Sequence, residues 1–158
     1  MTLNEKMKKY LDSLAVLLAS AWVGGLWVIG YIAAPVLFQT LSDKSLAGML
    51  AGRLFAATAY MGMVCAMYLL LYESAKFGRK VLVRSIFRIV VVMLLFTLAG
   101  QFGIQPLLAD LKTQALPLYV MDSSYAEQFK FWHGTASIIF LVQSVLGAVL
   151  LLKIHKDI

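Results

Sequence analysis

The stretch FWHGTASIIFLVQSVLGAVLLLKI (residues 131–154) decides the fold, because no charged side chain interrupts it between His133 and Lys153. Crossing a hydrocarbon core about 30 Å thick takes roughly 20 helical residues. The stretch is too long for a buried strand and shows no strict alternation of apolar and polar residues. Backbone groups left unpaired in lipid are costly, so a membrane-crossing segment of this kind must be a helix.

Three further apolar stretches precede it, at about 14–41, 47–72 and 85–108. The 158 residues are 61% hydrophobic and 14% charged, whereas soluble domains carry about a quarter charged residues. The chain therefore lacks the polar surface of a water-soluble fold, and its length allows one domain. We predict an all-α integral membrane protein in which residues 1–158 form an antiparallel four-helix bundle in the lipid bilayer, with one long loop at 109–130.

The basic residues predict the orientation of this bundle. Ten Lys and Arg residues lie beside the two termini or between the second and third stretches, and four lie on the opposite side, which accounts for all 14. The side richer in Lys and Arg is expected in the cytoplasm, so both termini are cytoplasmic and the loop 109–130 faces outward. Each basic cluster adjoins an apolar stretch. The net charge of +6 therefore indicates topology and no nucleic-acid partner.

Small residues predict how the helices pack. Lipid offers no hydrophobic drive for helix association, so close contact depends on small side chains. Two prolines near the outer ends of the first and third helices, Pro35 and Pro106, each free a backbone carbonyl, which would produce a kink or line a polar cavity. The positions expected in helix packing are Gly24, Gly25, Pro35, Gly62, Gly134 and Gly147.

Polar residues near the outer ends of the helices predict a candidate site. His133 and Ser137 share one stripe of the fourth helix, and the third helix aligns Gln101 with Gln105. Polar side chains within a span usually face the bundle interior. With Arg53 at the start of the second helix, these residues would form a small polar pocket that binds or passes a small ligand or metal ion. In the alternative interpretation, His133 only caps its helix or hydrogen-bonds Gln105.

Cofactor binding would centre on His133, because histidine is the commonest metal ligand. The other histidine, His155, lies about 33 Å along the same helix, so the two cannot ligate one haem. The string from Met61 to Met67 contains the only cysteine, Cys65, and would suit copper, but helical geometry splits its sulfur ligands between opposite faces. No paired nucleophile and base is present. We therefore expect a protein that is not an enzyme, with haem or copper as lesser alternatives.

The sequence resembles a family of small bacterial inner-membrane proteins of unknown function that is related to eukaryotic transmembrane protein 205. The resemblance rests on WVGG in the first helix, APVLF at its outer end, AGMLAGRLF, QP at 105–106 and FWHGTAS at 131–137. More distantly, the chain is similar to copper-resistance D-type membrane proteins and to the haem-binding protoporphyrinogen oxidase-like membrane family. The motif positions are Trp22, Gly24, Gly25, Pro35, Phe38, Gly52, Gln105, Pro106, His133, Gly134 and Ser137.

The resemblance implies a location in the bacterial inner membrane but no agreed activity, although the eukaryotic relatives are associated with platinum-drug resistance. Three hypotheses follow. The first is a non-enzymatic protein with a ligand pocket around His133. The second is a structural or assembly partner of other membrane proteins or of a second copy, based on the small-residue faces. The third is a membrane redox protein that binds haem or copper.

Overall fold

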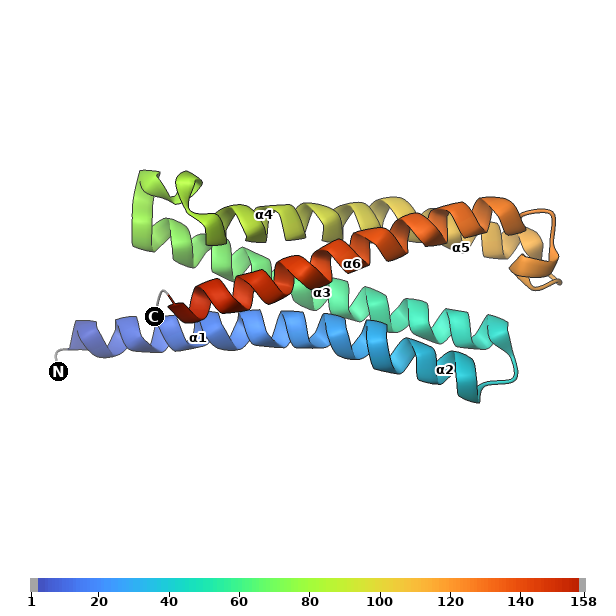
Figure 1. Cartoon of the computed structure of the whole chain (residues 1–158), viewed down its shortest axis with the longest axis horizontal. Coiled ribbons are helices and arrows are strands. Elements are labelled where there is room, and N and C mark those ends of the chain that lie inside the picture. The colour runs from blue at the N-terminus through green and yellow to red at the C-terminus, as the bar shows by residue number, and fades with distance from the viewer. Residues whose placement is uncertain (1–2, 157–158) are drawn as a thin grey trace.

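A computed structural model describes residues 3–156, which form an elongated bundle of helices without a strand in that range (Figure 1). The described residues contain six α-helices and four short π-helical or 3-10 segments, which are labelled η. In chain order, the elements are α1 (Leu3–Trp27), η1 (Val28–Ala33), α2 (Ala34–Thr40), α3 (Lys44–Phe77), η2 (Gly78–Val83), α4 (Ser85–Leu98), η3 (Ala99–Ile104), α5 (Gln105–Ala115), η4 (Val120–Asp122) and α6 (Ala126–Lys156).

These elements join into four continuous helical rods, each long and apolar enough to cross a membrane: Glu5–Thr40, Lys44–Val83, Ser85–Ala115 and Ala126–Lys156. The prediction of an all-α chain with four candidate membrane spans is therefore confirmed. In Figure 1 the colour gradient runs along the molecule and back twice, so the two ends of the chain lie together. We call that end the terminal end and the opposite one, which carries residues 41–43 and 116–125, the loop end.

The prediction of a loop at 109–130 is wrong for most of that range. Helix α5 continues to Ala115, and α6 already begins at Ala126. Residues 109–115 and 126–130 lack the apolar pattern from which the spans were predicted, so the continuation of the two helices was not predicted. Helix α5 stops just before Leu116 because the next residue, Pro117, disfavours a helical conformation in the residue before it.

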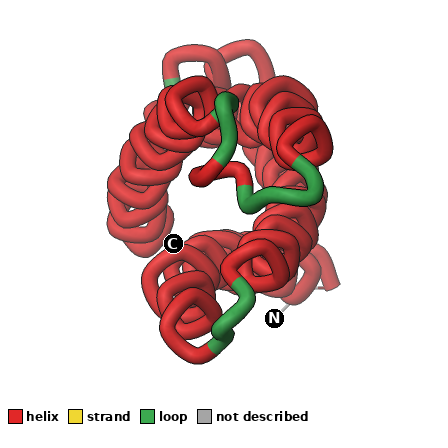
Figure 2. The backbone as a smooth tube through the Cα atoms, turned by 90° about the vertical axis from the view of Figure 1, so that its right-hand side faces the viewer, coloured by secondary structure: helices red, strands yellow, loops and turns green. Residues whose placement is uncertain are grey.

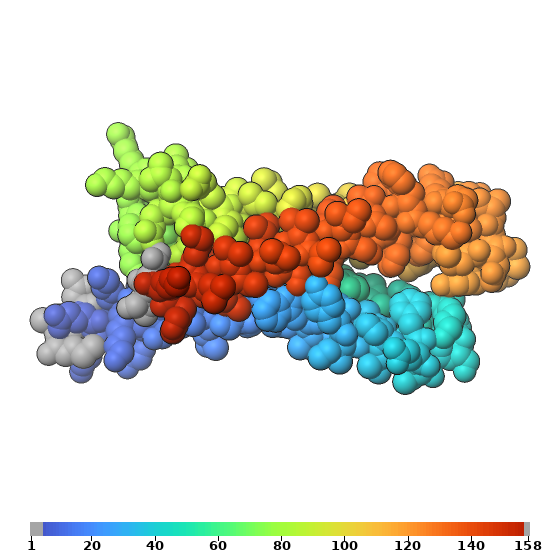
Figure 3. Space-filling view, viewed as in Figure 1, coloured from blue at the N-terminus to red at the C-terminus, as the bar shows by residue number. Residues whose placement is uncertain are grey.

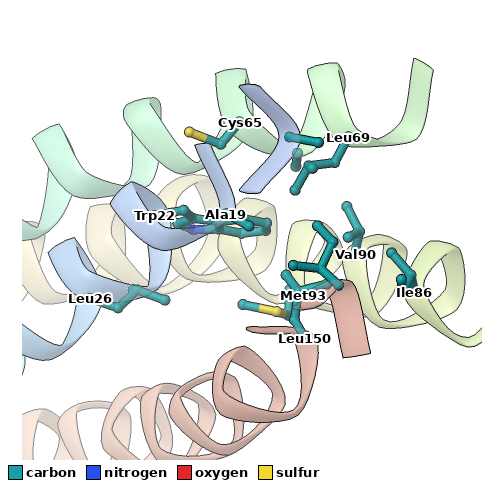
Figure 4. Packing of buried hydrophobic residues seen from close by; sticks show 12 residues of the cluster. Ala19, Trp22, Leu26, Cys65, Leu69, Ile86, Val90, Met93 and Leu150 are labelled. Carbon is teal, nitrogen blue, oxygen red and sulfur yellow. The ribbon is translucent and has the colours of Figure 1, made fainter. Parts of the chain in front are cut away.

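The tightly packed core lies in the half of the bundle toward the terminal end, which we call the terminal half. Side chains of α1, α3, α4 and α6 meet there, and Trp22 is fully buried among them (Figure 4). Small residues of α1 such as Ala15 and Ala19 allow the helices to approach. The buried cluster consists of Ala15, Ala19, Trp22, Leu26, Cys65, Ala66, Leu69, Ile86, Val90, Met93, Leu150 and Ile154.

Three of the glycines expected in packing lie against another helix. Gly62 lies under the indole of Trp22, a Cβ on Gly147 would lie 3.0 Å from Val23, and one on Gly25 would lie 2.7 Å from Met61. Gly24 and Gly134 differ, because a Cβ there would meet nothing within 4 Å. No described neighbour therefore lies where a side chain at these two positions would project, and their role in helix packing stays a prediction.

Polar contacts tie the rods together in and near this half. The amide of Gln143 in α6 donates to the Met93 carbonyl at 2.9 Å and to Thr97 Oγ1 at 2.8 Å, which joins α6 to α4. Closer to the terminal end, Lys76 lies 3.1 Å from the carboxylate of Asp12, and Tyr72 donates to the same carboxylate. These contacts join α1 to α3.

Each of the two π-helical segments ends two residues before a proline, Pro35 or Pro106. The N–H of Ala34 bonds to the carbonyl of Ile29, and that of Gln105 bonds to Gly100, so both bonds span five residues instead of four. A proline ring clashes with the carbonyl four residues earlier and cannot donate to it, and winding this turn as a π-helix accommodates both effects. The first and third rods thus carry the same irregularity at equivalent places.

Candidate ligand cavity in the loop half

The half of the bundle toward the loop end, the loop half, encloses a cavity of about 630 Å³. Helix α2 packs on α3, and α5 packs on α6. Between these two pairs there is little contact in the described chain, since α2 scarcely touches α6 and α3 scarcely touches α5. The cavity lies between these two pairs. Viewed from the loop end, the helix backbones are arranged in a ring (Figure 2), and the space-filling view is hollowed between α2 and α6 (Figure 3). Ligand pockets commonly have volumes of about 300–1,000 Å³.

The cavity is larger and more apolar than the small polar pocket expected from the sequence. Trp22 and Leu26 of α1 form its floor beside the terminal-half core. Aromatic rings form much of the wall, and two of them, Phe55 and Phe140, meet edge to face with centroids 5.9 Å apart. The apolar lining includes Trp22, Leu26, Pro35, Phe38, Phe55, Phe96, Leu108, Phe129, Ile139 and Phe140.

Four of the predicted site residues line this cavity. Gln101 comes from η3, Gln105 from the start of α5, and His133 and Ser137 from α6. Neither Gln101 nor Gln105 hydrogen-bonds another described side chain or carbonyl, so their amides are open to a ligand. The Ser137 hydroxyl instead donates to the carbonyl of His133, 2.9 Å away within its own helix.

His133 belongs to a small cluster with Lys112 and Phe129. Its imidazole stacks on the ring of Phe129, with centroids 5.7 Å apart and planes 7° from parallel. The Nζ of Lys112 lies 5.8 Å from the centroid of the same ring and donates to the carbonyl of Gly48 at 3.3 Å. No hydrogen bond joins His133 to Gln105 among the described residues. The cluster therefore presents a histidine and a lysine to the loop-end part of the cavity.

Arg53 does not line the cavity, contrary to the sequence-based expectation. Its side chain is exposed, whereas Gly52 beside it lines the space. Successive residues of a helix are about 100° apart. The face of α3 that meets the cavity carries Gly48, Gly52 and Phe55, and Arg53 points away from it.

Residues 116–125 lie across the loop end of the cavity. The segment η4 crosses the central space in Figure 2, and Tyr119, Val120 and Met121 line the cavity from that side. We call the apolar cluster that fixes the segment the roof cluster. It consists of Leu111, Ala115 and Val120 with Tyr119, Met121, Tyr125, Phe129 and Trp132 packed against them.

The lining offers one histidine as a metal or haem ligand. Among the lining residues, His133 is the single residue of the His, Cys, Asp and Glu types, and no group of three or more such residues close enough to hold a metal occurs in residues 3–156. The sulfur ligands considered for copper are used elsewhere, since Cys65 is buried in the terminal-half core and Met61 packs against Gly25. His155 lies on the same continuous helix as His133, so one chain cannot place both on one iron.

Sequence reasoning missed Lys112, Gln143 and the aromatic wall. Lys112 follows the apolar stretch and was expected in a loop, but its spacing from Leu108 and Leu111 is that of one helical face. Gln143 is the one amide inside the last apolar stretch, a signal that could have been used. No comparable signal marks the aromatic residues, because a phenylalanine side chain is as stable facing lipid as it is facing the cavity.

The fold and the cavity together define a four-helix candidate membrane protein with a mostly apolar chamber between its helices. Residues 17–117 match the family described as "Domain of unknown function (DUF4149)". Because the match covers more than half of the chain, the protein belongs to this family. The matched region ends before α6, so His133 and Ser137 lie outside it. No curated protein and no solved structure matches the chain. The relation to transmembrane protein 205 and to copper-resistance D-type proteins stays a prediction.

Proposed function

We propose that this protein is a non-enzymatic, multi-pass membrane protein that holds a small, largely apolar molecule in the loop-half cavity. The observation that carries this proposal is the cavity itself, about 630 Å³ in volume, with aromatic walls and the unpaired amides of Gln101 and Gln105. Binding sites of this kind combine an apolar lining with a few polar groups that orient the ligand. The single histidine among the lining residues makes a metal ion the weaker choice.

The proposed setting is the bacterial inner membrane, with the bundle antiparallel, the terminal end in the cytoplasm and the loop end outside. Support comes from the ten Lys and Arg residues on helices and turns at the terminal end against four at the loop end. Pro35, Pro106 and the two π-helical segments then lie in the outer half of the bilayer. Such π-helical irregularities are frequent at functional sites.

The proposal is tested by filling the cavity. Ala136 lines the space from α6, whereas Ile138 on the same helix is 66% exposed and does not line it. Native mass spectrometry of protein purified in mild detergent should show a bound small molecule in the wild type and in Ile138→Phe but not in Ala136→Phe. Retention of the same molecule by a folded Ala136→Phe protein would refute binding at this place.

A structural or assembly role is the second candidate function. Gly24 and Gly134 support this role, because each has open space where a Cβ would project. Small residues of this kind permit the close approach of another membrane helix. Crosslinking in the native membrane should then yield a homodimer or a complex with another membrane protein that Gly24→Leu or Gly134→Leu abolishes. A monomer in all three proteins would remove this candidate.

A further inference from the structure

We infer that the occupant of the cavity is a single-chain amphiphile with an anionic headgroup, held with its head at Lys112 and His133 and its chain toward Trp22. This inference rests on the proposed function and specifies the ligand class for the same site. Three features of the cavity carry it: where it opens, how its lining is graded, and what charge it contains.

The cavity opens sideways. Its loop end is crossed by residues 116–125 and the roof cluster, while the hollow between α2 and α6 faces perpendicular to the long axis of the bundle (Figure 3). In a bilayer that hollow faces acyl chains instead of water. A ligand that passes through it must already be dissolved in the membrane.

The kind of residue that lines the cavity changes along the helix axis. Lys112 and His133 lie near the loop end, and Gln143, Trp22 and Leu26 lie at the deep end. From Phe129 to Gln143 the cavity follows α6 for about 20 Å, whereas half of a hydrocarbon core is about 15 Å thick. The cavity is therefore about as deep as one leaflet, and a lipid-like chain could enter it at its usual depth in the membrane.

The charge in the cavity is positive. Lys44 and Lys112 line it, and no aspartate or glutamate is among the lining residues. The ammonium group of Lys44 already has hydrogen-bond partners at the end of α2, since it donates to the carbonyls of Phe38 and Leu41. Lys112 donates to the Gly48 carbonyl, but no carboxylate pairs with it in the described chain. Lys112 is partly buried, and a buried cation is costly unless an anion pairs with it.

The experiment uses the protein in nanodiscs with Trp27→Phe and Trp132→Phe, which leaves Trp22 as the single tryptophan at the cavity floor. The probes are 16-bromohexadecanoate, its 5-bromo isomer and the neutral methyl ester of the first, each added at a defined fraction of the lipid. Bromine quenches tryptophan at short range. The carboxylate should quench Trp22 at about one-tenth of the concentration that the ester needs, because a charge-assisted contact is worth about a factor of ten or more. The 5-bromo isomer should quench less, since its bromine stays near the head.

Lysine substitutions test the headgroup contact. Lys112→Gln should remove the preference for the carboxylate, and Lys112→Arg should keep it. The matched control is Lys130→Gln, because Lys130 is also at the loop end but pairs with Glu127 at 2.8 Å and does not line the cavity. Equal quenching by carboxylate and ester, or a preference that survives Lys112→Gln, would overturn the inference and leave the proposed function standing. Absence of saturable Trp22 quenching by all three probes would overturn both.

Discussion

The terminal half and the loop half of the bundle use the same four rods but fill the space between them differently. In the terminal half, α1, α3, α4 and α6 pack around Trp22 and a continuous apolar core. In the loop half, the rods separate into two pairs with a cavity between them. The change comes where η1 and η3 interrupt the first and third rods.

Small residues and prolines have opposite effects in the two halves of this fold. Gly62 and Gly147 remove side chains where rods must touch, and the terminal half closes around them. Pro35 and Pro106 disturb the helices that contain them, and each lies beside the cavity or next to a residue that lines it. We expect the terminal half to provide stability and the loop half to provide the site, and three experiments test how the terminal half is held together.

The largest effect is expected for Gly62→Leu, which would place a side chain where the indole of Trp22 lies. Overpacking of a filled core costs about 3 kcal/mol, so the melting temperature in detergent should fall steeply or the folded protein should be lost. Gly24→Leu is the matched control, since a side chain there meets open space. Equal melting temperatures for the two variants would contradict a tightly packed terminal half.

A smaller effect is expected for Gln143→Met, which keeps the size of the side chain but removes its bonds to Met93 and Thr97. Interhelical hydrogen bonds in membranes are worth about 1 kcal/mol. Chemical unfolding in mixed micelles should show a loss of that order. Gln114→Met should show none, because Gln114 bonds only to the exposed Asp110 of its own helix. A Gln143 variant as stable as the wild type would show that packing alone joins α4 to α6.

The smallest effect is expected for the ion pair between Asp12 and Lys76. Both side chains are partly accessible, and pairs of this kind contribute about 1 kcal/mol or less. A double-mutant cycle with Asp12→Asn and Lys76→Met should give a coupling free energy in that range, and it should decrease with added salt. A coupling well above 2 kcal/mol would show that this pair, and not the apolar core, is the main tie between α1 and α3.

The four helical rods could be predicted from the sequence, because a segment that crosses lipid must be a long apolar helix and residues 131–154 are such a segment. The residues at which the rods end could not be predicted in the same way. The polar residues of α5 and of the first turns of α6 read as loop, although the helices continue there. Residues of these helical turns pack in the roof cluster, a tertiary contact that no local sequence pattern predicts.

The candidate site was predictable in its polar part and hidden in its apolar part. Gln101, Gln105, His133 and Ser137 stand out from an apolar background, and all four line the cavity. Phe140 in the wall differs in no sequence feature from Phe102 or Phe131, which are 59% and 66% exposed. Which phenylalanine faces the cavity depends on the rotation of each rod, and the π-helical segments change that rotation partway along.

The segment η1 has a consequence for the length of the first rod. A π-helical turn takes in one residue more than an α-helical turn, so everything beyond it is rotated by about 100° from the course of a regular helix. Deleting one residue between Trp22 and Pro35 would let this turn return to a regular α-helix with Pro35 and Phe38 still facing the cavity. Adding one residue would leave hydropathy and charge almost unchanged, yet it would turn both residues from the cavity toward the lipid. The number of residues between Trp22 and Pro35 is therefore constrained by the fold, whereas the identity of most of those residues is constrained less.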